Sequence, residues 1–159
     1  MPKTLLMPSG QIHASFSSSA TSQALTSNPM DYVVSTRTST VTLTTSGTAQ
    51  NAVSSPLSLS SGLWAVFLHV WFNQNSSSWT KIECNINSSS TASTITIDSD
   101  YSNYCVRTID STVIEDTLSI PFYYIFLTAS TSYYAKVRAT WSGGTGAQFR
   151  CRFHAVKLT

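Results

Sequence analysis

The chain has 159 residues, of which 42% are hydrophobic, 11% aromatic and only 10% charged. This length allows one domain with a proper core and excludes two domains of ordinary size, while the aromatic content excludes a disordered protein. A net charge of +2 without clustered Lys and Arg excludes the electrostatic footprint of a DNA- or RNA-binding protein. Ser and Thr make up about a third of the chain and, with the aromatic residues, favour strands and turns over helices.

Residues 1–30 are predicted to form an extended N-terminal arm. Their isolated apolar residues follow neither a helical nor a strand period, and the first ten residues lack the apolar core of a secretory signal. Such a segment cannot by itself offset ordering costs of about 1 to 2 kcal/mol per residue. Either the arm is a terminus without a partner, or its apolar side chains bind a neighbouring molecule; the candidates are Leu5, Leu6, Met7, Ile12, Phe16 and Leu25.

Residues 31–159 are predicted to form one domain whose central strand is 62–72. Residues 32–34 and 41–43 are predicted to belong to one or two strands near a sheet edge, where Thr is common, and a short strand over 57–59 follows them. The segment 62–72 reads GLWAVFLHVWF, apolar on both faces at a period of two, and too short to cross a membrane as a helix, which needs about 20 residues. An antiparallel strand in a lone sandwich should alternate between apolar and polar residues. We therefore expect a second copy of the chain to cover its other face.

The odd-numbered face of this strand is the predicted subunit interface: Ala65, Phe67, His69 and Trp71. On a closed three-fold axis each subunit would offer the same strand, and the apolar patch would disappear from the surface. We expect His69 to form hydrogen bonds with its neighbours there. Three copies of His69 could instead bind a metal, or repel one another when protonated.

The second half of the chain completes the predicted sandwich. Alternation over 81–86 and 133–141 indicates clear strands, weaker ones are expected at 95–97 and 104–109, and an aromatic strand at 122–127 follows 118–120. The last strand begins at 148. Its inward-facing apolar residues are odd-numbered up to Ala155 and even-numbered from Val156, which predicts a bulge near His154. Eight or nine short strands and no convincing helix predict an all-β fold, a single antiparallel β-sandwich of the jelly-roll type with about eight strands.

No catalytic, cofactor or metal site is predicted, and we expect no enzyme activity. The chain has no GxSxG, P-loop or HExxH motif. Its carboxylates between 98 and 116 are interpreted as solvated loop residues, with a calcium site or a glycosidase pair as alternatives. Arg150 and Arg152 share a strand face, interpreted as a solvated surface rather than a phosphate site. Cys84, Cys105 and Cys151 lack metal or redox spacing. Buried apolar roles are expected for Cys84 and Cys151, in a protein that matures in a reducing cytosol.

Three segments together resemble a known family of β-sandwich domains. They are LSLSSGLWAVFLHVWF, TLSIPFYYIFLTASTSYYAKVRATWSGGTGAQF, and a closing strand rich in Arg and aromatic residues. This pattern is similar to a domain that recurs in tailed-bacteriophage virions, in tail fibres, tailspikes and capsid decoration proteins. It covers about residues 55–159 and records the placement of strands and turns. Related domains commonly trimerise, like the jelly rolls of the C1q and tumour necrosis factor type.

The resemblance implies a virion structural protein. The short arm departs from the fibre members, so the expected function is that of a trimeric capsid decoration, or cement, protein, made in the host cytoplasm and bound to the capsid surface. Its expected partners are its own copies and the major capsid protein, with no nucleic acid and no membrane. The alternative is a receptor-binding tip of a tail fibre, whose aromatic loop residues Trp79, Tyr101 and Tyr104 would stack on host polysaccharide.

Overall fold

The computed structural model describes residues 3–6, 12–16, 31–75, 78–110 and 112–158. The chain divides into two units, residues 1–31 and 32–159. In the first unit, β1 (Lys3–Leu6) pairs antiparallel with β2 (Ile12–Phe16). The binding role of residues 1–30 stays a prediction. None of the described residues belongs to a helix long and apolar enough to cross a membrane.

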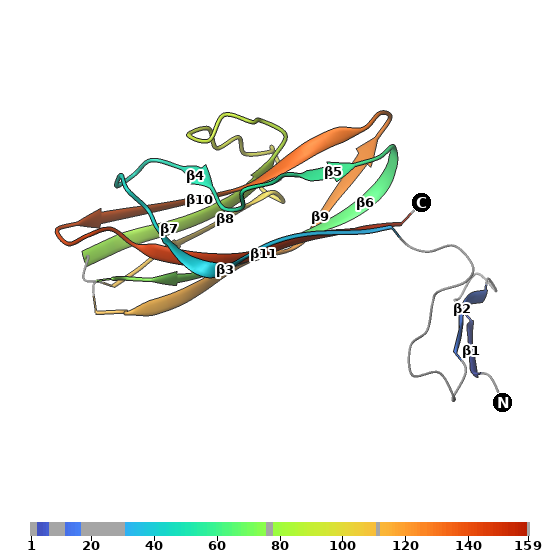
Figure 1. Cartoon of the computed structure of the whole chain (residues 1–159), viewed down its shortest axis with the longest axis horizontal. Helices are drawn as coiled ribbons and strands as arrows, with labels where there is room; N and C mark the ends of the chain where they lie inside the picture. The colour runs from blue at the N-terminus through green and yellow to red at the C-terminus, as the bar shows by residue number, and fades with distance from the viewer. Residues whose placement is uncertain (1–2, 7–11, 17–30, 76–77, 111, 159) are drawn as a thin grey trace. The chain divides into compact units, whose positions relative to one another are not determined.

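The second unit is a β-sandwich of two antiparallel sheets, which confirms the predicted all-β fold (Figure 1). One sheet has the order β3-β11-β6-β9, with bounds Tyr32–Thr42, Gln148–Lys157, Gly62–Asn73 and Glu115–Leu127. The other has the order β4-β10-β7-β8, with bounds Gln50–Asn51, Thr131–Ser142, Ser78–Asn87 and Tyr104–Thr108. A short strand β5 (Leu57–Leu59) also pairs with β10.

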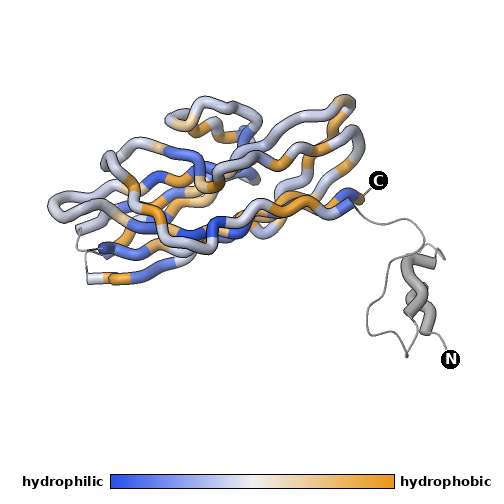
Figure 2. The backbone as a smooth tube through the Cα atoms, viewed as in Figure 1, coloured by the Kyte–Doolittle hydropathy of each residue, from blue (hydrophilic) through white to orange (hydrophobic). Residues whose placement is uncertain are grey.

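The core lies between the two sheets and is filled by every second residue of each strand. Figure 2 shows apolar residues recurring along the strands of both sheets. In β6 the even-numbered side chains point into the core, and all five are buried: Trp64, Val66, Leu68, Val70 and Phe72. The predicted period of two is therefore correct for the central strand, because strand side chains alternate between the two faces.

A loop that follows β7, residues 88–103, supplies buried contacts for the outer face of the five-stranded sheet. Asn85 and Asn103 both donate side-chain hydrogen bonds to the carbonyl of Thr96, each at 2.9 Å. Asn87 does the same for the carbonyl of Thr94 at 3.3 Å. The predicted strand at 95–97 is wrong, because these amides satisfy backbone groups that a strand would pair with another strand.

A buried carboxylate, that of Glu83, connects three strands on this same face. Arg138 of β10 donates two hydrogen bonds to it, at 2.5 and 2.6 Å, and Lys81 lies 3.2 Å away. Tyr104 of β8 donates a further hydrogen bond through its hydroxyl. Burial alone would raise the pKa of Glu83, but the hydrogen bonds from Arg138, Tyr104 and Lys81 hold it below its ordinary value. The carboxylate stays charged and fixes β7 to both of its neighbours.

The predicted bulge near His154 is also wrong. The pairing of β11 with β6 runs without a shift from Gln148 to Lys157, and Ala155 stays buried like the inward residues before it. The irregularity lies in β3, whose residues 38–40 are extra in its pairing with β11 between Phe149 and Cys151. Val156 faces outward beside Tyr32, so its apolar character belongs to the surface and gives no sign of a shift in phase.

We expect that Glu83→Gln lowers the free energy of unfolding by about 3 kcal/mol, since it removes one partner from a buried ion pair. The measurement is urea unfolding at neutral pH. Asp116→Asn is the matched control, because Asp116 pairs with Arg107, whose side chain is 55% exposed. That substitution should cost less than about 1 kcal/mol. Equal losses in the two variants would contradict the central role of Glu83.

Candidate functional site

The outer face of the four-stranded sheet carries the candidate site. Each odd-numbered residue of β6 points away from the core, and the register with β9 and β11 places partners beside it in rows. Phe67 lies beside His154, His69 beside Arg152 and Ser119, and Trp71 beside Arg150 and Thr117. The rows show that this face has two chemically different halves.

One half is apolar and will be called the aromatic face. Three of its β9 side chains are largely exposed: Phe122 at 58%, Tyr124 at 61% and Phe126 at 73%. Phe67 packs edge-on against Phe122, and Phe122 stacks on Tyr124. The full set comes from all four strands and comprises Tyr32, Val34, Leu63, Ala65, Phe67, Phe122, Tyr124, Phe126, His154 and Val156.

A bulge at Pro121 explains why so many aromatic residues face outward. Val66 pairs with Tyr123 and Leu68 with Ile120, so Pro121 and Phe122 together oppose the single residue Phe67. Proline suits this place because it has no N–H to donate to the ladder. Before the bulge, the even residues of β9 point into the core; after it, the odd ones do, as the buried Ile125 and Leu127 show. The extra residue thereby exposes Phe122, Tyr124 and Phe126.

His154 is the one titratable histidine within the aromatic face. Its ring stacks on Phe67, with centroids 4.7 Å apart, and tilts against Tyr32 at 5.8 Å. Among the described residues, no group forms a hydrogen bond with its buried Nδ1. Burial, followed by the nearby charge of Arg152, lowers the pKa of His154 below its ordinary value of 6.5. The neutral ring therefore suits this surface, and the protonated ring does not.

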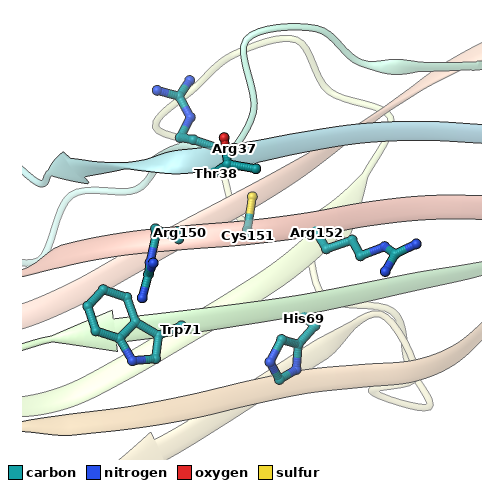
Figure 3. A pocket seen from close by; sticks show the side chains of 7 residues that line it. All are labelled: Arg37, Thr38, His69, Trp71, Arg150, Cys151 and Arg152. Carbon is teal, nitrogen blue, oxygen red and sulfur yellow. The ribbon is translucent and has the colours of Figure 1, made fainter.

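The other half of the face is polar and basic (Figure 3). The Arg150 guanidinium lies over the Trp71 ring, 4.2 Å from its centroid, and Arg152 donates a hydrogen bond to the Tyr32 hydroxyl at 3.3 Å. His69 Nδ1 lies 2.7 Å from the Ser119 hydroxyl. A surface hollow of about 270 Å³ lies here, lined by Arg37, Thr38, His69, Trp71, Arg150, Cys151 and Arg152. The ion pairs found among the described residues include neither Arg150 nor Arg152.

The four side chains predicted for the subunit interface do lie on this one face, but in different halves. Ala65 is buried and Phe67 half-buried in the aromatic face, whereas His69 is exposed and Trp71 half-buried in the basic half. Their role between subunits stays a prediction. The sequence interpretation did not include Phe122, Tyr124 and Phe126; Pro121, which interrupts the alternation, is the signal that could have revealed them.

The predicted arm residues are only partly described. Leu5 and Leu6 belong to β1, and Ile12 and Phe16 belong to β2. Met7 and Leu25 lie outside the described residues. Their predicted contact with a capsid protein therefore stays a prediction.

Most of the other residues singled out in the sequence have structural partners. Trp79, expected on a loop, is fully buried in β7 and donates a hydrogen bond to the Val113 carbonyl, so that expectation is wrong. Tyr101 is exposed. Asp98 accepts a hydrogen bond from Tyr123, and Asp110 accepts two from Thr112 in a turn. Among the described residues, no group of three or more His, Cys, Asp or Glu side chains could hold a metal ion.

Comparisons with known proteins find distant structural similarity only. No family model matches the chain, and no curated protein matches it. The Eiger TNF structure from S. frugiperda shares 16% identity with a TM-score of 0.49, over 83% of this chain and 94% of that chain. A chain of the cyanophage Pam1 capsid asymmetric unit shares 11% identity with a TM-score of 0.42, over 92% and 99%. A chain of the acid-stable capsid of Helicobacter pylori bacteriophage KHP30 shares 11% identity with a TM-score of 0.41, over 80% and 89%.

These similarities are distant, since each pair of chains shares less than a fifth of its residues.

Acidification through the histidine range is expected to destabilise the domain through His154. Because its pKa is lowered on folding, its contribution is complete above the unfolded value of 6.5 and is lost as the pH falls toward the folded value. His154→Phe, which keeps a ring between Phe67 and Tyr32, should lose less stability than the wild type between about pH 7.5 and about pH 5.5. Urea unfolding at both pH values is the measurement. Equal losses of stability in the wild type and in His154→Phe over this pH range would contradict the assignment.

Proposed function

We propose that this protein is a structural subunit of a bacteriophage virion, a homotrimeric decoration protein that binds the assembled capsid and stabilises it. The observation that carries the proposal is the aromatic face. A soluble monomer rarely exposes a contiguous apolar patch built from several large side chains, and such patches are typical of interaction surfaces. Here Phe122, Tyr124 and Phe126 are all more than half exposed on one strand.

A closed ring of identical subunits is the simplest arrangement that covers this surface. In a cyclic assembly each copy presents the same patch to the shared axis. Every patch is then buried, and no further chain can join the ring. The number three comes from the sequence resemblance to trimeric jelly rolls. With only 10% charged residues, the chain has little like-charge repulsion to oppose close contact between copies. Arg150 and Arg152 would then lie at the border of the buried area, because their rows follow those of the aromatic face.

Binding to a capsid would act by mass action. A clamp that binds only the assembled shell stabilises it by RT ln(1 + [L]/Kd), which is about 4.1 kcal/mol at a thousandfold excess over Kd. The major capsid protein is the proposed partner and residues 1–30 the proposed contact. The mature location would be the outer surface of the virion, after synthesis in the host cytoplasm.

One observation favours the alternative, recognition of host polysaccharide by a tail-fibre tip. A polar hollow of about 280 Å³ is lined by Asn87, Ser88, Ser89, Thr96, Asp98, Asn103, Tyr123 and Tyr133. Aromatic rings beside hydroxyl, amide and carboxylate groups are a surface on which a sugar could both stack and form hydrogen bonds. This hollow is separate in its residues from the aromatic face, so the two functions can be tested separately.

Removing the aromatic face should convert the trimer into monomers. The double variant Tyr124→Ser with Phe126→Ser changes two side chains that are exposed in the single chain, so the fold should persist while the contact is lost. Light scattering should give the molar mass of three chains for the wild type and of one chain for the variant. The matched control is Tyr101→Ser with Ile114→Ser, two side chains that are each 65% exposed and lie outside the aromatic face. A monomeric wild type, or an unchanged mass in the first variant, would refute the proposal.

Deleting residues 1–30 should abolish capsid binding and leave the molar mass at three chains. The expected reason is that the arm contacts the capsid protein, whereas the sandwich holds the subunits together. Co-sedimentation with empty capsids measures the first effect and light scattering the second. A parallel pull-down with host envelope polysaccharide separates the two functions, since a decoration protein should stay with the capsids. Capsid binding that is unchanged after the deletion would refute the role of the arm.

A further inference from the structure

Two of the three cysteines are brought together by the pairing of β7 with β8. In that register Cys84 lies directly opposite Cys105, although 20 residues separate them in the chain. All three cysteines are free. Ile86 donates a backbone hydrogen bond to Asn103 at 2.9 Å, and Ile109 donates one to Thr80 at 2.9 Å. Hydrogen-bonded pairs alternate along an antiparallel ladder, so Cys84 and Cys105 also form such a pair.

The Cα spacing at this position allows a disulfide bond, for which the Cβ atoms of a hydrogen-bonded pair, about 5 Å apart, must approach to within about 4.5 Å. The Cα atoms of a hydrogen-bonded antiparallel pair are about 5.5 Å apart, within the range of about 4.4 to 6.8 Å that disulfides span. Residues directly opposite one another also share a face of the sheet, so both side chains lie on the core side, where Cys84 is buried among Ile82 and Ile86. Joining the two sulfur atoms therefore requires no exchange of strands.

The two thiols differ in access and in acidity. Cys84 is fully buried, whereas Cys105 is only partly buried on β8, the last strand of its sheet. A hydrogen bond from the Cys84 thiol, helped by a backbone group of Ser119 and the charge of Arg107, lowers the pKa of Cys105 to about 6 against the effect of burial. The same hydrogen bond, together with burial, raises the pKa of Cys84. Cys105 thus has the character of an attacking thiolate and Cys84 that of its resolving thiol.

Cys151 serves as an internal comparison. It lies on β11 in the other sheet, and its sulfur contacts the Ala52 carbonyl at 3.3 Å. Burial raises the pKa of its thiol to about 11. An inert buried cysteine is therefore present in the same chain as the pair.

We infer that Cys84 and Cys105 form a redox pair that closes to a cross-strand disulfide on reaction with a small disulfide of the glutathione type. The Cys105 thiolate attacks one sulfur of that disulfide, forms a mixed disulfide and releases one thiolate. The Cys84 sulfur then attacks the Cys105 sulfur, the second small thiol leaves, and the Cys84 proton passes to the departing thiolate. One small disulfide is reduced to two thiols and one protein disulfide is formed, so atoms and electrons balance.

The closed bond would join the sheet-edge strand β8 to β7 across the loop that follows β7. The loop it closes contains residues 85–104, and cross-linking it reduces the freedom of the unfolded chain. The oxidised protein should therefore unfold at a higher temperature than the reduced protein. This inference does not depend on the proposed assembly.

The test uses the full chain, reduced and then exposed to oxidised glutathione at about pH 7.5, where a thiolate with a lowered pKa predominates. After denaturation, the wild type should show one free thiol in place of three, an intact mass lower by two hydrogen atoms, and a linked peptide that contains Cys84 and Cys105. Three remaining thiols, a persistent glutathione adduct, or a link between separate chains would overturn the inference.

Three variants assign the roles. Cys84→Ala should stop at a single glutathione adduct on Cys105, and Cys105→Ala should not react. Cys151→Ala should close the disulfide as the wild type does. Far-ultraviolet circular dichroism checks that each variant is folded before oxidation. Disulfide formation that requires Cys151, or an adduct on Cys84 in the Cys105→Ala variant, would contradict the assignment.

Discussion

The exposure of the aromatic residues of β9 depends on one extra residue at Pro121. A strand has a strict period of two, so a single inserted position moves every later side chain to the opposite face. Before Pro121 the strand buries Leu118 and Ile120; after it, the strand buries Ile125 and Leu127. Without that shift, Phe122, Tyr124 and Phe126 would point into a core that Trp64 and Phe72 already help to fill. The bulge therefore creates both a well-packed interior and an apolar exterior.

The outer faces of the two sheets differ in whether their side chains are covered. On the five-stranded sheet, the charge of Glu83 is balanced by Arg138 and Lys81. The loop 88–103 covers this face, and its carbonyls accept hydrogen bonds from buried Asn side chains. Lys136 is fully buried, and its ammonium donates a hydrogen bond to the Thr91 carbonyl. Within residues 32–159 the aromatic face of the other sheet stays open, with large side chains exposed. The covered face contributes to the stability of the domain, whereas the open face leaves large apolar side chains exposed.

The pairing of strands also brings together reactive and charged groups that lie far apart in the chain. Cys84 and Cys105 meet because antiparallel pairing folds a 20-residue connection back on itself. Arg150 reaches Trp71 because β11 lies beside β6, although four strands, β7 to β10, lie between them in the chain. Such contacts are properties of the register between strands. They give this small domain a basic hollow, an apolar surface and a thiol pair without any dedicated motif.

The sequence by itself determined the all-β fold, the central strand with two apolar faces and the residues of β6 that point into the core. It could do so because the alternation of side chains is a local property of a strand. It also placed Ala65, Phe67, His69 and Trp71 on one outward face. Only the tertiary structure decided which residues complete that face, that 95–97 is a loop, that Trp79 is buried and that two cysteines are neighbours. Each of these depends on the pairing of distant strands, on a bulge that reverses their faces, or on side-chain amides that replace a strand partner, and none leaves a periodic pattern in the chain.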